Sequence, residues 1–103
     1  MSKQYTIYLG ITSIDYDKHC KPPLEQWLNQ ISHVITQEGI RGATITPSFG
    51  LWEGKLEYGY TISIINTGDV TLDMLYTICR GLNKVFHQQC ILLTTQTIKD
   101  ELI

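Results

Sequence analysis

Few side chains in this 103-residue sequence are of the types that perform chemistry, and they are scattered. Histidine and cysteine, both common zinc ligands, occur together at His19-Cys20 and again at His87 and Cys90. A zinc site needs three or four ligands that converge on one point, whereas adjacent residues point apart and the second pair straddles the end of a predicted helix. We therefore predict no metal ion and no cofactor. Cys20, Cys79 and Cys90 are an odd number at long spacings, which predicts reduced thiols.

Nucleophilic or acid–base catalysis has equally little support. The sequence contains no Gly-x-Ser-x-Gly segment and no cysteine and histidine in a recognised catalytic setting. Gly50, Gly54 and Gly59 are spread through a predicted hairpin rather than placed between a strand and a helix, so turn and bulge geometry explains them better than a phosphate-binding loop. We predict that the protein is not an enzyme.

Charge and hydropathy exclude further classes of protein. The formal net charge is −2 and no basic cluster is present, so the electrostatic attraction that drives nucleic-acid binding is missing. No run of about 18 apolar residues occurs, and the sequence starts with a strand pattern, which indicates neither a membrane span nor a signal peptide. We expect one domain, residues 1–103, in the cytoplasm, or in the host cytoplasm if the protein is phage-encoded. Only 17% of its residues are charged, and such a surface tolerates protein partners.

A long β-hairpin at residues 39–66 forms the centre of the predicted architecture. Two runs rich in Thr, Ile, Tyr and Phe flank a Glu-Gly pair at 53–54, whose unhindered backbone suits a tight reversal. Pro47 lacks the N–H that a central strand needs, so the first strand of the hairpin is predicted to lie at a sheet edge. Alternating apolar residues predict a further strand from Tyr5 to Ile11, and the apolar run that starts at Cys90 predicts the last one.

Two helices separate these strands. An apolar stripe predicts one helix from Pro23 to about Glu38, closed by Gly39 in the left-handed conformation. The second helix follows the turn at residues 66–69 and is capped by Thr71 or Asp69. Its stripe is wide, which indicates burial on a second side against another subunit. The stripe consists of Leu72, Leu75, Tyr76, Cys79, Leu82 and Phe86, widened by Met74, Ile78 and Val85.

The order strand, helix, hairpin, helix, strand predicts an α+β fold of the ferredoxin-like βαββαβ type. Right-handed crossovers arrange its four antiparallel strands in the order 4-1-3-2, with both helices on one face. The predicted core consists of Ile7, Leu9, Leu28, Ile31, Ile35, Ile62, Ile64, Leu75, Cys79, Leu82 and Leu92. The uncovered face is predicted to carry Thr6, Tyr8, Thr44, Thr46, Thr61 and Ser63, together with Ile91 and Leu93.

Two strand segments resemble the RNA-recognition motif, namely residues 7–10 (Ile-Tyr-Leu-Gly) and residues 58–61 (Tyr-Gly-Tyr-Thr). In that family the aromatic residues of the third strand face outward and stack on bases. Here Tyr58 and Tyr60 share a face with Ile62 and Ile64, so exposing the tyrosines would also expose both isoleucines. We therefore predict that the tyrosines face the core and that the protein binds no RNA.

Four other segments carry a wider resemblance: residues 5–10 (Tyr-Thr-Ile-Tyr-Leu-Gly), 42–45 (Gly-Ala-Thr-Ile), 50–52 (Gly-Leu-Trp) and 86–93 (Phe-His-Gln-Gln-Cys-Ile-Leu-Leu). Together they resemble small, mostly uncharacterised ferredoxin-like proteins of bacteria and their phages. By fold the chain also looks similar to the nitrogen-regulatory PII-like trimers, which bind nucleotides between subunits. The long loop that those trimers carry between strands two and three is absent here, because the reversal at 53–54 is short.

These observations favour a non-enzymatic binding protein, encoded by a phage or mobile element, that binds or sequesters a small nucleotide-like ligand as a homo-oligomer. One alternative is a phage inhibitor of a host defence protein that acts by protein–protein contact. A second alternative is a small dimeric ferredoxin-like barrel enzyme with His33 or His87 as its base.

Three residues are predicted to form the functional surface. Tyr8 and Leu93 are expected near the middle of the contact between copies, on the uncovered face of the sheet. Trp52 is expected to project from the hairpin tip toward a neighbour or partner. A ligand would bind at the margin of this contact, where the rings of Tyr8 and Trp52 could stack on a base.

Overall fold

The alternating and helical patterns form the predicted elements in the predicted order. The computed structural model describes residues 2–11, 24–66, 68–86 and 91–98. Its elements are β1 (Ser2–Ile11), α1 (Leu24–Gln37), β2 (Thr44–Trp52), β3 (Lys55–Asn66), α2 (Leu72–Phe86) and β4 (Leu92–Ile98). Neither of these helices is long and apolar enough to cross a membrane.

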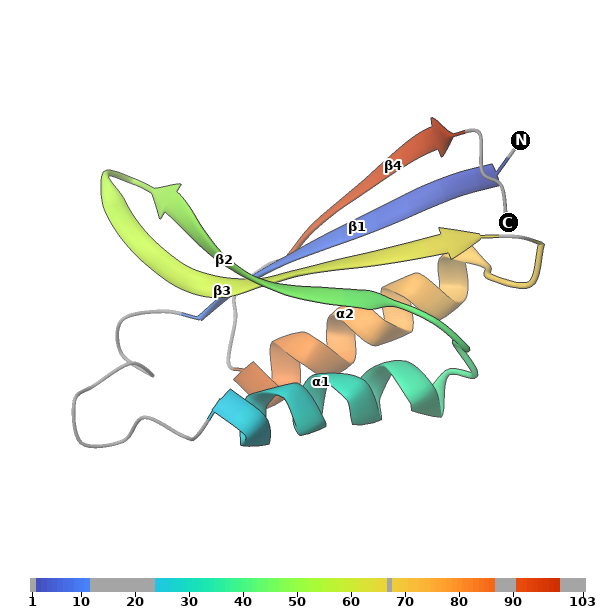
Figure 1. Cartoon of the computed structure of the whole chain (residues 1–103), viewed down its shortest axis with the longest axis horizontal. Helices are drawn as coiled ribbons and strands as arrows, with labels where there is room; N and C mark the ends of the chain where they lie inside the picture. The colour runs from blue at the N-terminus through green and yellow to red at the C-terminus, as the bar shows by residue number, and fades with distance from the viewer. Residues whose placement is uncertain (1, 12–23, 67, 87–90, 99–103) are drawn as a thin grey trace.

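The four strands form one antiparallel sheet in the order β2-β3-β1-β4. This confirms the predicted order, with Pro47 in an edge strand and the first and third strands in the centre. Both helices lie against the same face of the sheet, and the β2–β3 hairpin curls away beyond the end of β1 (Figure 1). The ferredoxin-like fold class is therefore confirmed.

The hairpin turn depends on two residues with positive φ. Trp52 pairs with Lys55, and the intervening Glu53 and Gly54 have φ values of 50° and 74°. A two-residue turn with both central residues in the left-handed region is of type I′, whose twist matches the right-handed twist of the strands. This turn fixes the register of the whole hairpin, because it contains no extra residue that would let one strand slide along the other.

The core lies between the sheet and the helices. Of the predicted core residues, Ile7, Leu9, Ile31, Ile35, Ile62, Ile64, Leu75 and Leu82 are buried, and Leu28 and Cys79 are partly buried. The core also contains Tyr5, Trp27, Ile40, Tyr60, Ile78 and Phe86. The inward orientation predicted for the third-strand tyrosines is confirmed, because Tyr60 is fully buried and the Trp27 ring packs against both Tyr58 and Tyr60.

The prediction of which β4 residues face the helices is wrong, because the strand is shifted by one residue from the predicted register. Leu93 pairs with the buried Ile7 and packs against the core, so it lies on the helix side of the sheet and not beside Tyr8 on the uncovered face. Leu92, predicted in the core, is instead the register partner of the exposed Tyr8. Since directly opposed residues of antiparallel strands share a face, a shift of one residue exchanges the faces of the whole strand.

The stripe of α2 is narrower than predicted. Leu75, Ile78, Leu82 and Phe86 are buried, whereas Leu72 and Tyr76 are about half exposed. The predicted cap is confirmed, since the Met74 backbone N–H donates to the Thr71 hydroxyl at 3.2 Å. The exposed residues of α2 form a second surface, which is described below.

The two helices approach each other closely at Gly81. A Cβ added to Gly81 would lie 3.0 Å from Cγ1 of Val34 on α1. The Val34 side chain must therefore move before even a methyl group fits at position 81. Alanine in place of glycine favours a helix by about 1 kcal/mol, but overpacking costs about 1–3 kcal/mol.

We expect Gly81→Ala alone to lower the free energy of unfolding by about 1 kcal/mol. In a Val34→Ala background, where the obstructing methyl groups are gone, the same change should raise it by about 1 kcal/mol. Urea denaturation of the four proteins of this double-mutant cycle measures both effects. Equal effects in the two backgrounds would show that Val34 is not the obstacle.

Candidate functional site

The predicted site residues are spread over the sheet. Tyr8 is 45% exposed on the face opposite the helices, as predicted. Tyr8 pairs with Thr61 of β3. Thr61 lies six residues along β3 from Lys55, which pairs with Trp52. At about 3.3 Å per residue, roughly 20 Å of strand separates Tyr8 from Trp52 within one chain. A ligand held by both rings would therefore need residues from two copies.

Around Tyr8 the uncovered face of the sheet carries no charged residue, and only toward the hairpin turn does the same alternation reach Glu57 and Lys55. Register and alternation place Gln4, Thr6, Tyr8, Thr44, Thr46, Ser48, Thr61, Ser63, Ile65, Thr94 and Gln96 on it. This confirms the predicted positions from Thr6 to Ser63. Solvated sheet faces and edges commonly carry charges that prevent association, and charged residues are depleted in the centres of protein interfaces. The composition of this face around Tyr8 is that of a contact surface.

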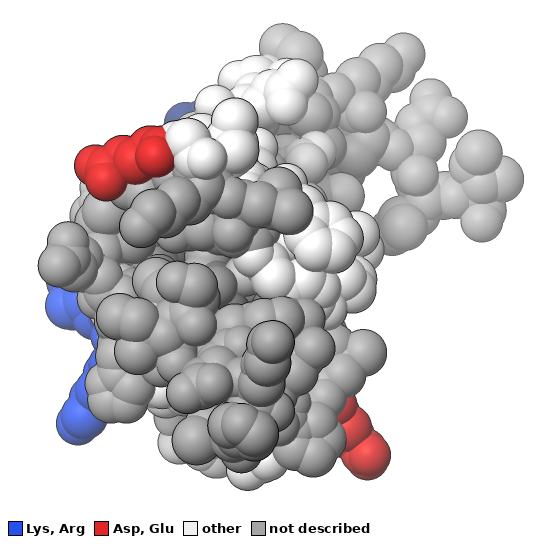
Figure 2. Space-filling view, turned by 90° about the vertical axis from the view of Figure 1, so that its left-hand side faces the viewer, with Lys and Arg blue, Asp and Glu red and all other residues white. Residues whose placement is uncertain are grey.

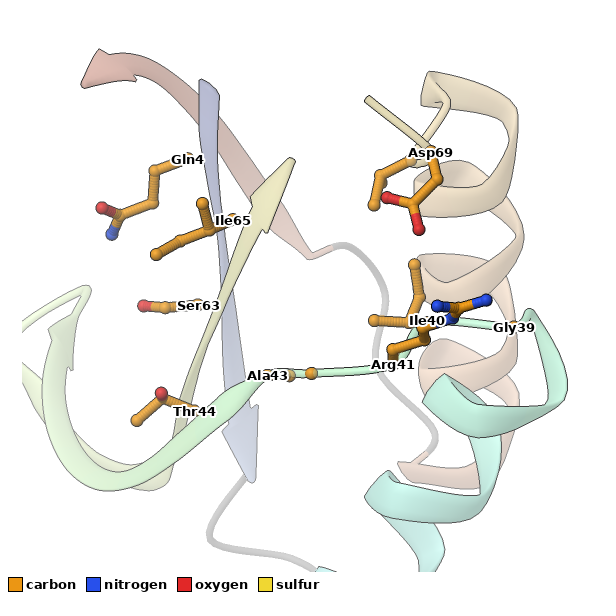
Figure 3. A pocket seen from close by; sticks show the side chains of 11 residues that line it. Gln4, Gly39, Ile40, Arg41, Ala43, Thr44, Ser63, Ile65 and Asp69 are labelled. Carbon is orange, nitrogen blue, oxygen red and sulfur yellow. The ribbon is translucent and has the colours of Figure 1, made fainter. Parts of the chain in front are cut away.

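A cavity of about 520 Å³ opens at one end of the sheet. Gln4, Thr44, Ser63 and Ile65 line it from the strands, with their side chains on the uncovered side of the sheet, and Arg41 and Asp69 line it from the connectors that enter β2 and α2 (Figure 3). The full lining is Gln4, Gly39, Ile40, Arg41, Gly42, Ala43, Thr44, Ser63, Ile65, Asp69 and Val70. Residues 39–44 contribute to this lining without interruption, and two of them are glycines.

The cavity exists because two neighbouring strands have unequal lengths. β2 begins at Thr44, opposite Ser63, whereas β3 continues to Asn66 with β1 as its partner. The end of β3 therefore has no ladder partner on its β2 side. Gly39, at φ 81° and with its N–H bonded to the Thr36 carbonyl at 3.0 Å, ends α1 as predicted and directs the chain along this gap.

Two opposite charges stand on the connector side of the cavity. Arg41 precedes β2 and Asp69 precedes α2, and both side chains are exposed (Figure 3). In the described part of the chain no ion pair joins either of them to another side chain, so both charges are available to a ligand. Neither residue was singled out from the sequence, since a lone arginine and a lone aspartate in two loops carry no motif.

The remaining candidate residues have structural explanations or lie outside the described residues. His33 is exposed on the wet side of α1, and His19, Cys20, His87 and Cys90 lie outside the described residues. Elsewhere in the described chain, no group of three His, Cys, Asp or Glu residues is arranged to hold a metal ion.

Cys79 is half buried, and this burial raises the pKa of its thiol although Arg80 acts in the opposite direction. A raised pKa leaves less thiolate at neutral pH and makes Cys79 a poor nucleophile.

On the end of the molecule that carries the hairpin turn, the described charged groups lie apart from one another (Figure 2).

The order of elements, the single open sheet and the helices on one side define a ferredoxin-like fold, and solved structures of similar fold match it. No protein-family model and no curated protein sequence matches the chain. A phage SAM lyase in complex with S-methyl-5′-thioadenosine matches at 17% identity, with a TM-score of 0.70 over 92% of this chain and 80% of the lyase.

Two proteins from cellular organisms also match. A DUF3240 family protein from Shewanella baltica is 8% identical, with a TM-score of 0.59 over 99% of this chain and 94% of that protein. The periplasmic divalent cation tolerance protein CutA from Archaeoglobus fulgidus is 15% identical, with a TM-score of 0.55 over 99% of this chain and 88% of CutA. At these identities the likeness shows the fold.

Proposed function

We propose that this chain is a binding protein for a small adenine nucleoside of the S-methyl-5′-thioadenosine class, that it acts as a homo-oligomer, and that it is encoded by a phage or mobile element. The observation that carries the proposal is the cavity beside the unpaired end of β3. The phage SAM lyase of similar fold, which holds this nucleoside in its solved structure, supports the choice of ligand and of source.

The chemistry of the cavity suits a nucleoside. Its volume of about 520 Å³ falls within the range of about 300–1,000 Å³ that is usual for small-molecule sites. The end of β3 offers main-chain hydrogen-bond donors and acceptors at fixed spacing. The edge of a purine base presents a complementary row of hydrogen-bond acceptors and donors. Ile65 and Val70 supply apolar surface for the ring, while Gln4 and Ser63 can bond to ribose hydroxyls.

The proposed oligomer forms through the uncovered face of the sheet, with Tyr8 near the centre of the contact. This face borders the cavity, because Gln4, Thr44 and Ser63 belong to both. A second copy packed on the face would therefore close one side of the cavity. Trp52, at the tip of the hairpin, is our proposed contact with a neighbouring copy.

The two glycines that accept a side chain without strain provide the test. At Gly42 and at Gly50 a Cβ would meet no atom within 4 Å, and neither residue has a positive φ. Gly42 lines the cavity and Gly50 lies in the hairpin. We expect Gly42→Phe to weaken binding of S-methyl-5′-thioadenosine at least tenfold by isothermal titration calorimetry, about 1.4 kcal/mol, and Gly50→Phe to change it less than twofold.

The reverse pattern would place the ligand at the hairpin near Trp52, and absence of heat with the nucleoside at millimolar concentration would refute the proposed function. Adenosine and inosine serve as comparison ligands. Inosine should bind more weakly, because it lacks the 6-amino donor of adenine.

A second candidate, a lyase of S-adenosylmethionine, is favoured by the likeness to the phage SAM lyase in both its ligand-bound and apo structures. The same protein preparation decides between the two. Consumption of S-adenosylmethionine above the rate without protein, followed by chromatography, would identify an enzyme. Binding of the nucleoside without consumption would identify a sequestering protein.

A further inference from the structure

One strip of helix α2 faces away from the core and is not explained by ligand binding. It consists of Asp73, Tyr76, Thr77, Arg80 and Lys84, all of them exposed. Their spacing of three or four residues places them along one side of the helix. The opposite side holds the buried Leu75, Ile78 and Leu82.

The charges of this strip have no ion-pair partner among the described residues. In the part of the chain that the structure describes, no ion pair involves Asp73 or Arg80. Thr77 links them only indirectly, since its hydroxyl donates to the Asp73 carbonyl at 2.9 Å and accepts from Nη2 of Arg80 at 3.3 Å. These bonds keep the Arg80 side chain along the helix. Tyr76, at the middle of the strip, is 46% exposed.

The strip is complementary to itself. Asp73 and Arg80 lie at equal distances along α2 from the point between Tyr76 and Thr77. When two copies of α2 pack antiparallel about a two-fold axis through that point, Asp73 of each copy faces Arg80 of the other. In such an isologous contact each pair occurs twice.

We propose that this strip is a self-association surface and that its partner is the same strip of a second copy, packed antiparallel. Charge complementarity selects this occupant. The strip carries an acidic residue toward one end and basic residues toward the other, and this polarity is matched by the same strip in reversed direction rather than by a partner of a single charge sign. The helix dipoles also favour the antiparallel arrangement, because each positive N-terminus then approaches a negative C-terminus.

The contact is expected to be weak and sensitive to salt. A helix of 15 residues is about 22 Å long, and one helix on another covers less than the roughly 1,200 Å² of a stable interface. The charge pairs lie at the rim, where salt screens them. The strip and the uncovered sheet face lie on opposite sides of the molecule, so both contacts can form together.

Charge exchange tests the proposal with the full chain. Sedimentation velocity at several concentrations, in low salt and in 0.5 M salt, measures the dissociation constant of the contact. We expect Asp73→Arg alone and Arg80→Asp alone each to raise it about tenfold. The double variant carrying both changes should return within about twofold of the parent, since every pair is restored with reversed sign.

An equimolar mixture of the two single variants should associate as strongly as the parent, because both charge pairs are again opposite. Glu25→Arg, an exposed acid in the first turn of α1, is the matched control and should have no effect. Circular dichroism checks that each variant is folded.

Three results would overturn the proposal: a parent that stays monomeric at all concentrations, single variants that associate as the parent does, or a double variant as weak as the single ones. Association that survives every α2 variant but is lost in Tyr8→Lys would assign the whole assembly to the sheet face. That result overturns the α2 contact and leaves the ligand site standing.

Discussion

Replacing Ile62 by alanine is expected to lower the free energy of unfolding by about 4 kcal/mol. Ile62 is fully buried in the centre of the sheet, with Ile7 and Ile45 as its register partners on the two neighbouring strands. Truncation removes three carbon atoms and leaves a cavity that fixed strands on both sides cannot close, and such unrelaxed sites give the larger losses.

Ile65 provides the matched control for this prediction. It lies three residues further along the same strand but is 47% exposed on the other face. Ile65→Ala should therefore cost less than about 1 kcal/mol. Urea denaturation of both variants measures the difference. Losses of similar size would mean that the sheet face bearing Ile65 is as thoroughly covered as the core.

Gly59→Ala is expected to lower the free energy of unfolding by about 3 kcal/mol. Gly59 pairs with Gly10 in the two central strands, and a Cβ added there would overlap the carbonyl oxygen of Leu9. The obstructing atom belongs to the backbone, so no rotamer change relieves the clash and the strands must separate. A glycine thus permits β1 and β3 to approach where the sheet bends toward the hairpin.

The control for this substitution is Gly50→Ala. Gly50 is also a strand glycine, but a Cβ there meets nothing within 4 Å. Alanine should be neutral or should stabilise by about 0.5 kcal/mol, because it restricts the unfolded chain. Thermal and urea denaturation distinguish the two variants. If Gly59→Ala proved as stable as Gly50→Ala, the close approach at Leu9 would be contradicted.

The sequence predicted the fold because its local signals agreed with one another. Pro47 indicated an edge strand, and the handedness of crossovers independently put the same strand at the edge. Gly39 marked the end of α1, and Thr71 marked the start of α2. Each of these residues acts through its own backbone or its immediate neighbours, so its effect can be recognised without knowledge of the tertiary structure.

The face of β4 could not be predicted in the same way. Residues 91–93 are Ile-Leu-Leu, an apolar run without alternation, so nothing local says which of Leu92 and Leu93 faces the helices. The pairing of Leu93 with Ile7 decides it. The cavity was missed for a related reason, since it results from the unequal ends of β2 and β3, and register at strand ends is a property of the assembled sheet.

The pairing of β1 with both β3 and β4 has a consequence during protein synthesis. β2 and β3 can pair within microseconds of leaving the ribosome, and β1 can join β3 as soon as Asn66 has emerged. β4 follows only when the chain has been extended to Ile98, and at about 5–20 residues per second this takes roughly 2 to 6 seconds.

For that time β1 presents a free edge, because its second partner does not yet exist. On a polysome, the last strand of one nascent chain can reach the first strand of its neighbour. Strand exchange between growing chains is therefore the misassembly to which this topology is most exposed.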